Sequence, residues 1–183
     1  EIQFGDWSSD VCSSDLVWMN GPATANDGGV FRSTNATAAT PTFTQTMVTG
    51  TASVRGMFAG YKQASAPTNV IYLASGEAST GTSCTATSTN QGALRVSTDG
   101  GVTWSGKLTG GGGFCGGQCF YNFGFDVRPG ATAAVADDKL WLGGNTSSST
   151  NCSRLHATST NGGSTFTNSA TGLHADTHFI KVD

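Results

Sequence analysis

The sequence is poor in charged residues, which make up only 11% of its 183 residues and leave a formal net charge of −3. It has no basic stripe of the kind that nucleic-acid binding requires, so nucleic acid is not an expected partner. No segment shows the 3.6-residue apolar period of an amphipathic helix, and no apolar run is long enough to span a membrane as a helix. Phosphate-binding loops, dinucleotide fingerprints and a Ser-His-Asp pattern are also absent, so we expect no cofactor.

Glycine, in contrast, is abundant, because the chain has 26 glycines, about twice the usual share. Serine, threonine, asparagine and alanine fill most of the remainder, and short apolar runs alternate with turn residues. Short strands separated by turn signals are typical of an all-β protein. The Ser/Thr/Asn-rich composition also suits an exported bacterial protein. We therefore expect an all-β fold that is secreted, periplasmic or on the cell surface.

The strongest local signal is the stretch Ser-Thr-Asp-Gly-Gly-Val-Thr-Trp at residues 97–104. Its short polar side chains can bond backbone amides, and its two glycines can take the positive φ of a tight turn. Related stretches begin at Ser33 and Ser159, so the three serines are 64 (97 − 33) and 62 (159 − 97) residues apart. This near-constant interval indicates one repeated supersecondary unit. The residues expected to build the three turns are Ser97, Asp99, Gly101, Thr103 and Trp104; Ser159, Asn161, Gly163, Thr165 and Phe166; and Ser33 and Asn35.

The stretch at residues 97–104 resembles the Asp-box (BNR repeat) motif of sialidase-like and sortilin-like β-propellers, S-x-D-x-G-x-T-W, at every defined position. The resemblance implies a partial β-propeller of about three four-stranded blades, with an Asp-box hairpin between the third and fourth strands of each blade. A propeller closes on roughly four to eight blades, so the remaining blades would be missing from this chain. The implied blades are residues 17–50, 51–110 and 118–170, with residues 177–183 as the first strand of the next blade.

Residues 1–16 resemble the translation of a short-read sequencing adapter rather than a natural protein segment. We therefore expect them to be non-native, the domain to begin at residue 17, and the chain to be a metagenomic fragment. Because nothing selected these residues to fit the fold, we expect them to have no packed place in the blade array.

The four cysteines outside residues 1–16 are Cys84, Cys115, Cys119 and Cys152, an even number in glycine- and serine-rich surroundings. This pattern favours disulfides formed in an oxidising compartment. We expect the pair to be Cys115 and Cys119, which would close a short glycine-rich loop. A zinc site is the alternative, but three residues separate these two cysteines and no second close pair accompanies them, so we expect no metal.

The candidate ligand site consists of residues that precede or open the first strands of blades. In the implied topology these residues lie on the face opposite the Asp-box turns, toward the concave inner edge of the blade array. We expect Tyr121 and Asn122 to bind ligand there. His174, Asp176 and His178 alternate, so an extended backbone would point all three to one side. They could then hold a metal or perform acid–base catalysis, with Asp176 as the first candidate. Alternatively, Asp176 caps its loop and the histidines bond neighbouring blades.

The resemblance implies two classes of function for this face. The first is an exported protein of the sialidase or glycoside-hydrolase type that binds or hydrolyses glycans. The sialidase Arg-Ile-Pro motif is absent, and a xyloglucanase-like mechanism would need a second carboxylate beside Asp176, so whether the chain is an enzyme stays open. The second class is a non-catalytic propeller of the sortilin kind, which would bind a protein or peptide.

Overall fold

The computed structural model shows an all-β chain, as the sequence predicts. Helical structure among the described residues is limited to two short 3-10 turns, η1 (Thr109–Gly111) and η2 (Val135–Asp137). None of the described segments forms a helix with the length and apolar character that membrane crossing requires. The described residues are 15–21, 27–49, 53–63, 69–78, 91–132, 134–145, 156–169, 172–173 and 176–183.

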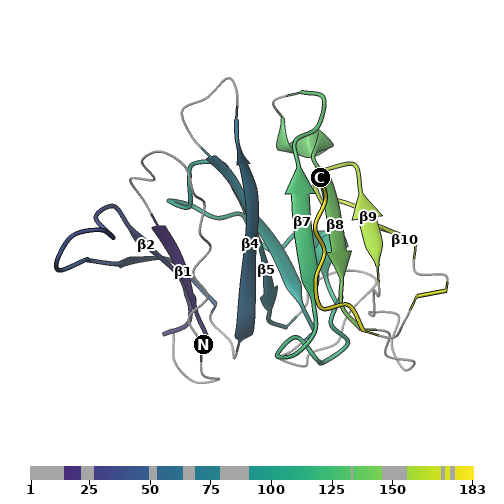
Figure 1. The fold of residues 1–183 in the computed structure, drawn as a ribbon, viewed down its shortest axis with the longest axis horizontal. Coiled ribbons are helices and arrows are strands. Elements are labelled where there is room, and N and C mark those ends of the chain that lie inside the picture. Colours follow the sequence, from purple (N-terminus) through teal and green to yellow (C-terminus); the bar gives the residue numbers. More distant parts are fainter. Residues whose placement is uncertain are drawn as a thin grey trace.

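Three antiparallel sheets stand side by side, and in each of them strands that are consecutive in the sequence pair with one another (Figure 1). The first sheet contains β1 (Asp15–Met19), β2 (Gly29–Ser33) and β3 (Thr44–Val48). The second contains β4 (Val54–Lys62), β5 (Asn69–Gly76) and β6 (Ala93–Ser97). The third contains β7 (Gly124–Arg128), β8 (Lys139–Gly143), β9 (Ala157–Ser159) and β10 (Thr167–Asn168).

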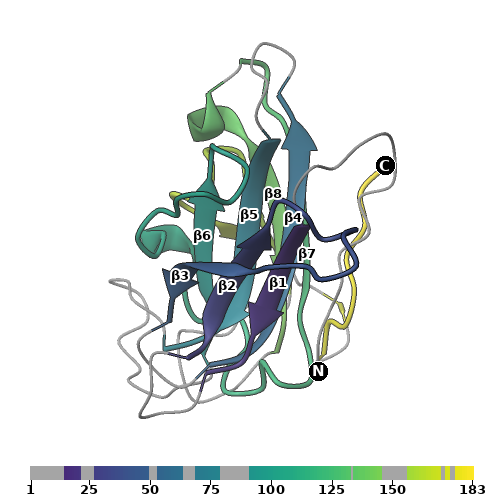
Figure 2. The same cartoon turned by 90° about the vertical axis from the view of Figure 1, so that its left-hand side faces the viewer.

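The sheets are stacked in the same orientation, with β1, β4 and β7 along one side of the molecule (Figure 2). Strand β4 contacts both β1 and β7. The C-terminal segment continues this row, because the Val182 amide donates to Asp126 Oδ2 of β7 at 2.8 Å. Residues 177–183 nevertheless carry no strand ladder. The expectation of a regular strand there is therefore wrong, although the segment does lie beside β7.

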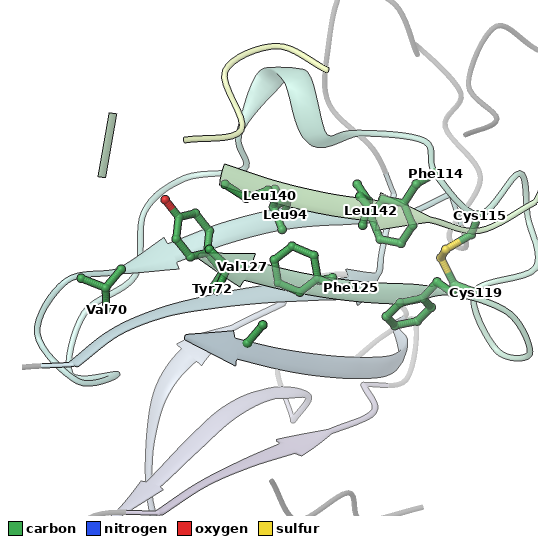
Figure 3. Close-up of a cluster of buried hydrophobic side chains, with 13 residues drawn as sticks. Val70, Tyr72, Leu94, Phe114, Cys115, Cys119, Phe125, Val127, Leu140 and Leu142 are labelled. Carbon is green, nitrogen blue, oxygen red and sulfur yellow. A yellow bond between two sulfur atoms is a disulfide. The ribbon is translucent and has the colours of Figure 1, made fainter. Parts of the chain in front are cut away.

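The second sheet is buried on both faces, because it lies between the other two sheets. Successive residues of a strand point to opposite faces, and β5 shows this directly. Tyr72 and Ala74 enter the large cluster shared with the third sheet, whereas Leu73 enters a smaller cluster with Trp18 of the first sheet. Figure 3 shows the large cluster, with the Cys115–Cys119 disulfide at one end.

A fourth strand of the second sheet, expected within residues 102–108, is not formed. Only two backbone bonds join this segment to β6, from the Ser105 amide to Val96 O (2.9 Å) and from the Leu108 amide to Leu94 O (2.8 Å). The physical reason lies in Ser105, whose hydroxyl oxygen accepts the Val96 amide hydrogen at 3.0 Å. A side chain thus takes the place of a ladder carbonyl, so the regular pairing is lost.

The domain start expected at residue 17 also needs correction. Asp15 pairs with Ser33 and Leu16 with Arg32 at the beginning of β1. Leu16 also packs against the smaller core cluster. Ladder hydrogen bonds use backbone atoms, so an edge strand can be extended by residues of any origin. The expectation of no packed place is therefore wrong for Asp15 and Leu16, while residues 1–14 lie outside the described residues.

The turn at Ser97 has the expected internal hydrogen bonds. Ser97 Oγ accepts the Gly101 amide at 2.8 Å, and Asp99 Oδ1 accepts the Val102 and Thr103 amides at 3.1 and 2.9 Å. Gly100 and Gly101 have φ values of 71° and 83°. A side chain would be strained at these angles, which explains the glycine pair in this turn.

The other two turns repeat the bond from the threonine amide to the side-chain oxygen, and Ser159 also repeats the serine bond by accepting the Gly163 amide at 3.0 Å. Asn161 Oδ1 accepts the Thr165 amide at 3.0 Å, and Asn35 Oδ1 accepts the Thr42 amide at 2.9 Å. The turn at Ser33 therefore accommodates its longer sequence without losing the bond between asparagine and threonine. The three predicted turns therefore share the bond from a threonine amide to an Asp or Asn side-chain oxygen.

The turns also connect neighbouring sheets. Arg32 Nε of the first sheet donates to Gly100 O at 3.1 Å. Trp104 is partly buried against the core cluster of the first two sheets, with its ring centroid 6.1 Å from that of Phe58. Phe166 packs against the large cluster in the same way, whereas Phe43 of the first sheet is 42% exposed. Each aromatic ring that follows a turn is thus covered only where another sheet lies against it.

Replacing Asp99 should show how much this turn contributes to stability. Burial disfavours the Asp99 carboxylate, but hydrogen bonds from Thr103, Ser97 and Val102 outweigh it, so the pKa of Asp99 lies below its usual value. The stabilisation is therefore present above about pH 4 and is lost as pH falls through the lowered pKa. We expect Asp99→Ala to cost about 1 to 2 kcal/mol at pH 7, measured by urea unfolding.

Asp99→Asn is the matched control, because Asn161 already occupies the equivalent position in the third sheet. The asparagine should retain the backbone bonds and cost less than about 1 kcal/mol, while removing the contribution of Asp99 to acid sensitivity. Equal losses for the alanine and asparagine variants would contradict this account of the turn.

Candidate functional site

The candidate site lies at the end of the sheets where β4 and β7 begin, which we call the loop face. The Ser97 turn lies at the other end, because the Gly100 amide bonds Asn69 O and Asn69 pairs with Lys62, the last residue of β4. The predicted separation of turns and loops onto opposite ends is therefore observed.

A disulfide shapes the loop that precedes β7. Cys115 and Cys119 are bonded, with Cα atoms 4.9 Å apart, so the predicted pair is confirmed. Both cysteines are fully buried, and the Cys115 amide bonds Gln91 O at 3.0 Å. The Tyr121 and Asn122 amides then bond Gln118 O within the same loop. The disulfide ring thus leads directly into the predicted ligand-binding residues, while Cys84 and Cys152 lie outside the described residues.

Four of the five predicted ligand-site residues come together on this face. The ring centroids of Tyr121 and His178 are 4.9 Å apart at an interplanar angle of 88°. Asn122, which is fully buried, donates from Nδ2 to Asp176 Oδ1 at 2.6 Å. The fifth residue, His174, lies outside the described residues.

The Asp176 carboxylate therefore has a partner that comes from the opposite side of the site rather than from its own loop. The backbone at Asp176 forms an isolated bridge with Asn145, and the Thr177 amide donates to Gly144 O at 2.8 Å. These bonds anchor the loop to the end of β8. In addition, Asn122 Oδ1 is buried without a protein partner. The Asn122–Asp176 contact thus joins two segments that are 54 residues apart in the sequence.

Sequence reasoning did not assign Arg55 to the site, although the structure places it there. Arg55 occupies an irregular position in β4, where the register shifts between Val54 and Gly56, and its φ is +38°. Such an angle is uncommon for a residue with a side chain and indicates local strain. Arg55 Nη1 donates to Tyr121 O at 2.7 Å, and its guanidinium lies 5.0 Å from the centroid of the Phe123 ring. In the sequence, the available signal for this role was the position of Arg55 near the start of the first strand expected in its repeat unit.

A pocket of about 360 Å³ opens beside Arg55. It is lined by Trp18 and Asn20 from the end of β1, by residues 54–56 of β4, and by Phe120 and Tyr121 from the loop before β7. Gly56 is required for this close approach, since a Cβ atom there would lie 2.6 Å from the Trp18 ring. Segments of all three sheets therefore contribute to one pocket.

The pocket combines aromatic surface with a few fixed polar groups. Phe120 and Tyr121 are 63% and 58% exposed at its rim, whereas Trp18 is only 2% exposed. Trp18 Nε1 donates to Asn20 Oδ1 at 2.9 Å, which orients the asparagine amide. The guanidinium of Arg55 adds the only charged group among the lining residues. Aromatic walls with a small number of oriented polar groups are typical of small-molecule sites.

A second, smaller pocket of about 260 Å³ lies toward the turns and is lined by Arg32, Val102 and four threonines. It contains no aromatic residue, so the loop-face pocket offers the more distinctive chemistry. No group of three His, Cys, Asp or Glu residues suited to a metal ion occurs in the part of the chain that the structure describes. Comparison of the chain with protein-family models, curated proteins and solved structures yields no match.

Proposed function

We propose that this chain is part of an exported Asp-box propeller that binds glycans at its loop face. The observation that carries the proposal is the convergence of Tyr121, Phe120, Arg55 and Asn20 on one pocket beside the Asn122–Asp176 contact. The three repeated turns and the parallel stacking of the sheets support the propeller part. The Cys115–Cys119 disulfide supports export, since such bonds persist in oxidising compartments.

The chemistry of the pocket matches a sugar better than an extended peptide. A sugar ring presents C–H groups on its faces, which can stack on the rings of Phe120 and Tyr121. Its hydroxyl groups both donate and accept hydrogen bonds, which suits an amide such as that of Asn20 and a guanidinium such as that of Arg55. A peptide would instead need a free strand edge or a longer groove. The pocket is a compact cavity at the ends of strands, which favours the glycan.

Hydrolysis would require more than the residues described at this face. A glycoside hydrolase uses two carboxyl groups about 5 to 9.5 Å apart, and Asp176 is the candidate for one of them. Its carboxylate is held by Asn122 and its backbone by the Asn145 bridge. We therefore propose glycan binding as the function. Whether the 183-residue chain also hydrolyses the glycan is measured by the release of reducing sugar.

Replacing Tyr121 tests the proposal. Tyr121→Ala removes an exposed ring from the pocket rim, and we expect binding to weaken about tenfold or more, as for other aromatic anchors. Titration calorimetry with xyloglucan oligosaccharides and with sialyllactose measures the dissociation constants. Phe43→Ala is the control, because Phe43 is a similarly exposed aromatic residue at the turn end. Unchanged glycan binding by Tyr121→Ala, or binding of peptides alone, would contradict the proposal.

A further inference from the structure

We propose that the second pocket, which lies toward the turns, binds a tetrahedral oxyanion, a phosphate or sulfate group, on the guanidinium of Arg32. This site is separate from the loop face and does not depend on the proposed glycan binding. The pocket has a volume of about 260 Å³. Pockets for drug-sized ligands span roughly 300 to 1,000 Å³, so this one suits a small group. Its lining residues are Arg32, Thr34, Thr42, Thr44, Thr46 and Val102.

The pocket forms where the first sheet meets the turn that follows β6. Arg32 Nε donates to Gly100 O of that turn at 3.1 Å, and Trp104 Nε1 donates to Thr46 Oγ1 at 3.4 Å. Arg32 and Thr44 are direct cross-strand partners in β2 and β3. Their side chains therefore leave the same face of the first sheet as neighbours. Two sheets, rather than a single loop, thus hold the lining groups in place.

The bond to Gly100 orients the Arg32 guanidinium and leaves its two terminal nitrogens available. Only Nε takes part in that bond, and Nη1 and Nη2 have no protein partner in the part of the chain that the structure describes. The ion pairs among the described residues involve Glu77 and Asp126, and none of them includes Arg32. The terminal nitrogens of an arginine can meet two oxygens of a phosphate or sulfate group side by side. An anion is therefore the ligand that this guanidinium fits.

The threonine hydroxyls favour a tetrahedral anion over a planar carboxylate. The Thr42 and Thr46 hydroxyls already donate to protein acceptors, at 3.1 and 3.5 Å. Thr34 and Thr44 are exposed, and their hydroxyls have no partner among the described residues. A guanidinium can occupy both oxygens of a carboxylate, whereas a phosphate or sulfate group has further oxygens that accept from hydroxyl donors. The free hydroxyls beside Arg32 match these additional oxygens.

The pocket also lacks a group that would repel an anion. Arg32 is the only ionisable residue in its lining. The acidic residue of the adjoining turn, Asp99, is not among the lining residues, and its carboxylate accepts hydrogen bonds from Val102 and Thr103 within the turn. The charge in the pocket is therefore positive.

Amide NMR titrations of the 183-residue chain at constant pH and ionic strength test the proposal. The probes are inorganic phosphate and inorganic sulfate, with acetate as the planar comparison. We expect saturable shifts of the Gly100 and Val102 amides with phosphate or sulfate, and several-fold weaker binding of acetate. Glucose 6-phosphate and glucose 6-sulfate, compared with glucose, identify the source of the group. Tighter binding of an ester than of the inorganic ion would indicate a group carried on a larger molecule, and the reverse order would indicate the free ion.

Arg32→Met should weaken binding of the oxyanion about tenfold or more, because it removes charge-assisted hydrogen bonds. Arg32→Lys keeps the charge but loses the paired terminal nitrogens, so it should recover only part of the affinity. Thr44→Val removes one hydroxyl at nearly constant shape and should weaken binding several-fold. Arg128→Met is the matched control, since Arg128 is also partly exposed and donates to Val182 O, outside the pocket. It should leave the affinity unchanged, and thermal melting verifies that all variants are folded.

Three results would overturn the proposal. The first is the absence of saturable shifts with both phosphate and sulfate. The second is equal weakening by Arg32→Met and Arg128→Met, which would show that binding depends on overall charge. The third is acetate binding as tightly as the tetrahedral ions. If Arg32→Met does not fold, Thr44→Val decides, because an unchanged affinity in that variant would also contradict the proposed site.

Discussion

Replacing Arg95 with methionine is expected to lower the free energy of unfolding by about 3 to 5 kcal/mol. Arg95 donates from Nη1 and Nη2 to the two carboxylate oxygens of Glu77 at 2.7 and 3.1 Å. Glu77 is fully buried and Arg95 is 7% exposed, so water cannot replace the lost partner. Among the described residues, the Arg95→Met variant leaves the buried carboxylate with Ser75 and Lys107 beside it, at 2.7 and 3.4 Å.

The double variant Glu77→Met/Arg95→Met separates the cost of leaving the buried Glu77 carboxylate without its arginine from the value of the Glu77–Arg95 pair. Replacing both partners of a buried pair with apolar residues is often neutral or even stabilising. We therefore expect the double variant to recover most of the stability lost in Arg95→Met. Urea unfolding at pH 7 measures both. Arg32→Met serves as the control, because Arg32 is partly exposed and makes one bond to Gly100 O; it should cost about 1 kcal/mol.

A double variant as unstable as Arg95→Met would show that the geometry of the pair, rather than the cost of the buried charge, determines the stability of this region. The distinction concerns the whole second sheet. Glu77 follows β5, Arg95 lies in β6, and Lys107 also donates to Ala78 O at 2.6 Å. The cluster therefore joins β5 and β6 to the segment that does not form a fourth strand.

Replacing Asp138 with asparagine is expected to change how stability depends on pH. Asp138 is fully buried, and its carboxylate accepts hydrogen bonds from Tyr61 and Tyr72, both at 2.8 Å. Burial raises the pKa of Asp138 above its usual value, although the tyrosine bonds and the Gly130 amide oppose the shift. The folded chain thus holds the proton more tightly than the unfolded chain does.

The direction in which stability changes with pH follows from that difference in proton binding. The contribution of Asp138 to stability is fully present below the unfolded pKa of about 3.9. It is lost as pH rises through the raised folded pKa. We therefore expect the stability of the unmodified chain, relative to Asp138→Asn, to be greatest at the acidic end and to decline toward pH 7. Urea unfolding of both chains across this range measures the difference. A constant difference would contradict the raised pKa.

Tyr61 and Tyr72 should control how the stability of the fold changes at alkaline pH. Burial, together with the hydrogen bonds to Asp138, raises the pKa of Tyr61 and of Tyr72 above the ordinary value. The unfolded chain therefore ionises first, near pH 10, and stability should fall as pH rises beyond that point. Tyr72→Phe should reduce this fall. It also removes a bond to a buried carboxylate, so a loss of about 1 to 3 kcal/mol is expected at pH 7.

Features that depend on short stretches of chain could be predicted from the sequence. The turns at Ser33, Ser97 and Ser159 form through hydrogen bonds between residues close in the chain, so their residue types are sufficient to predict them. The disulfide joins cysteines separated by only four positions. The positions of the strands could be predicted from alternating apolar residues between turns. Their order in each sheet could be predicted because hairpin connections join consecutive strands. The all-β class and the pairing of consecutive strands were therefore predictable.

Features that depend on distant segments were not predictable in this way. The pocket needs Trp18, Arg55 and Tyr121, and no local pattern links residues so far apart. The role of Arg55 depends on an irregularity in β4, and the missing strand near Ser105 depends on one hydroxyl competing with a carbonyl. Asp15 and Leu16 extend β1 because the adjacent strand β2 offered backbone groups with which they could pair. The turns, the disulfide and the strand class could thus be predicted from the sequence alone, since these require only neighbouring residues. The pocket and the buried Asp138 cluster could not be predicted, because both depend on how separate sheets pack against one another, and the Glu77 cluster depends on contacts between β5, β6 and the segment after β6.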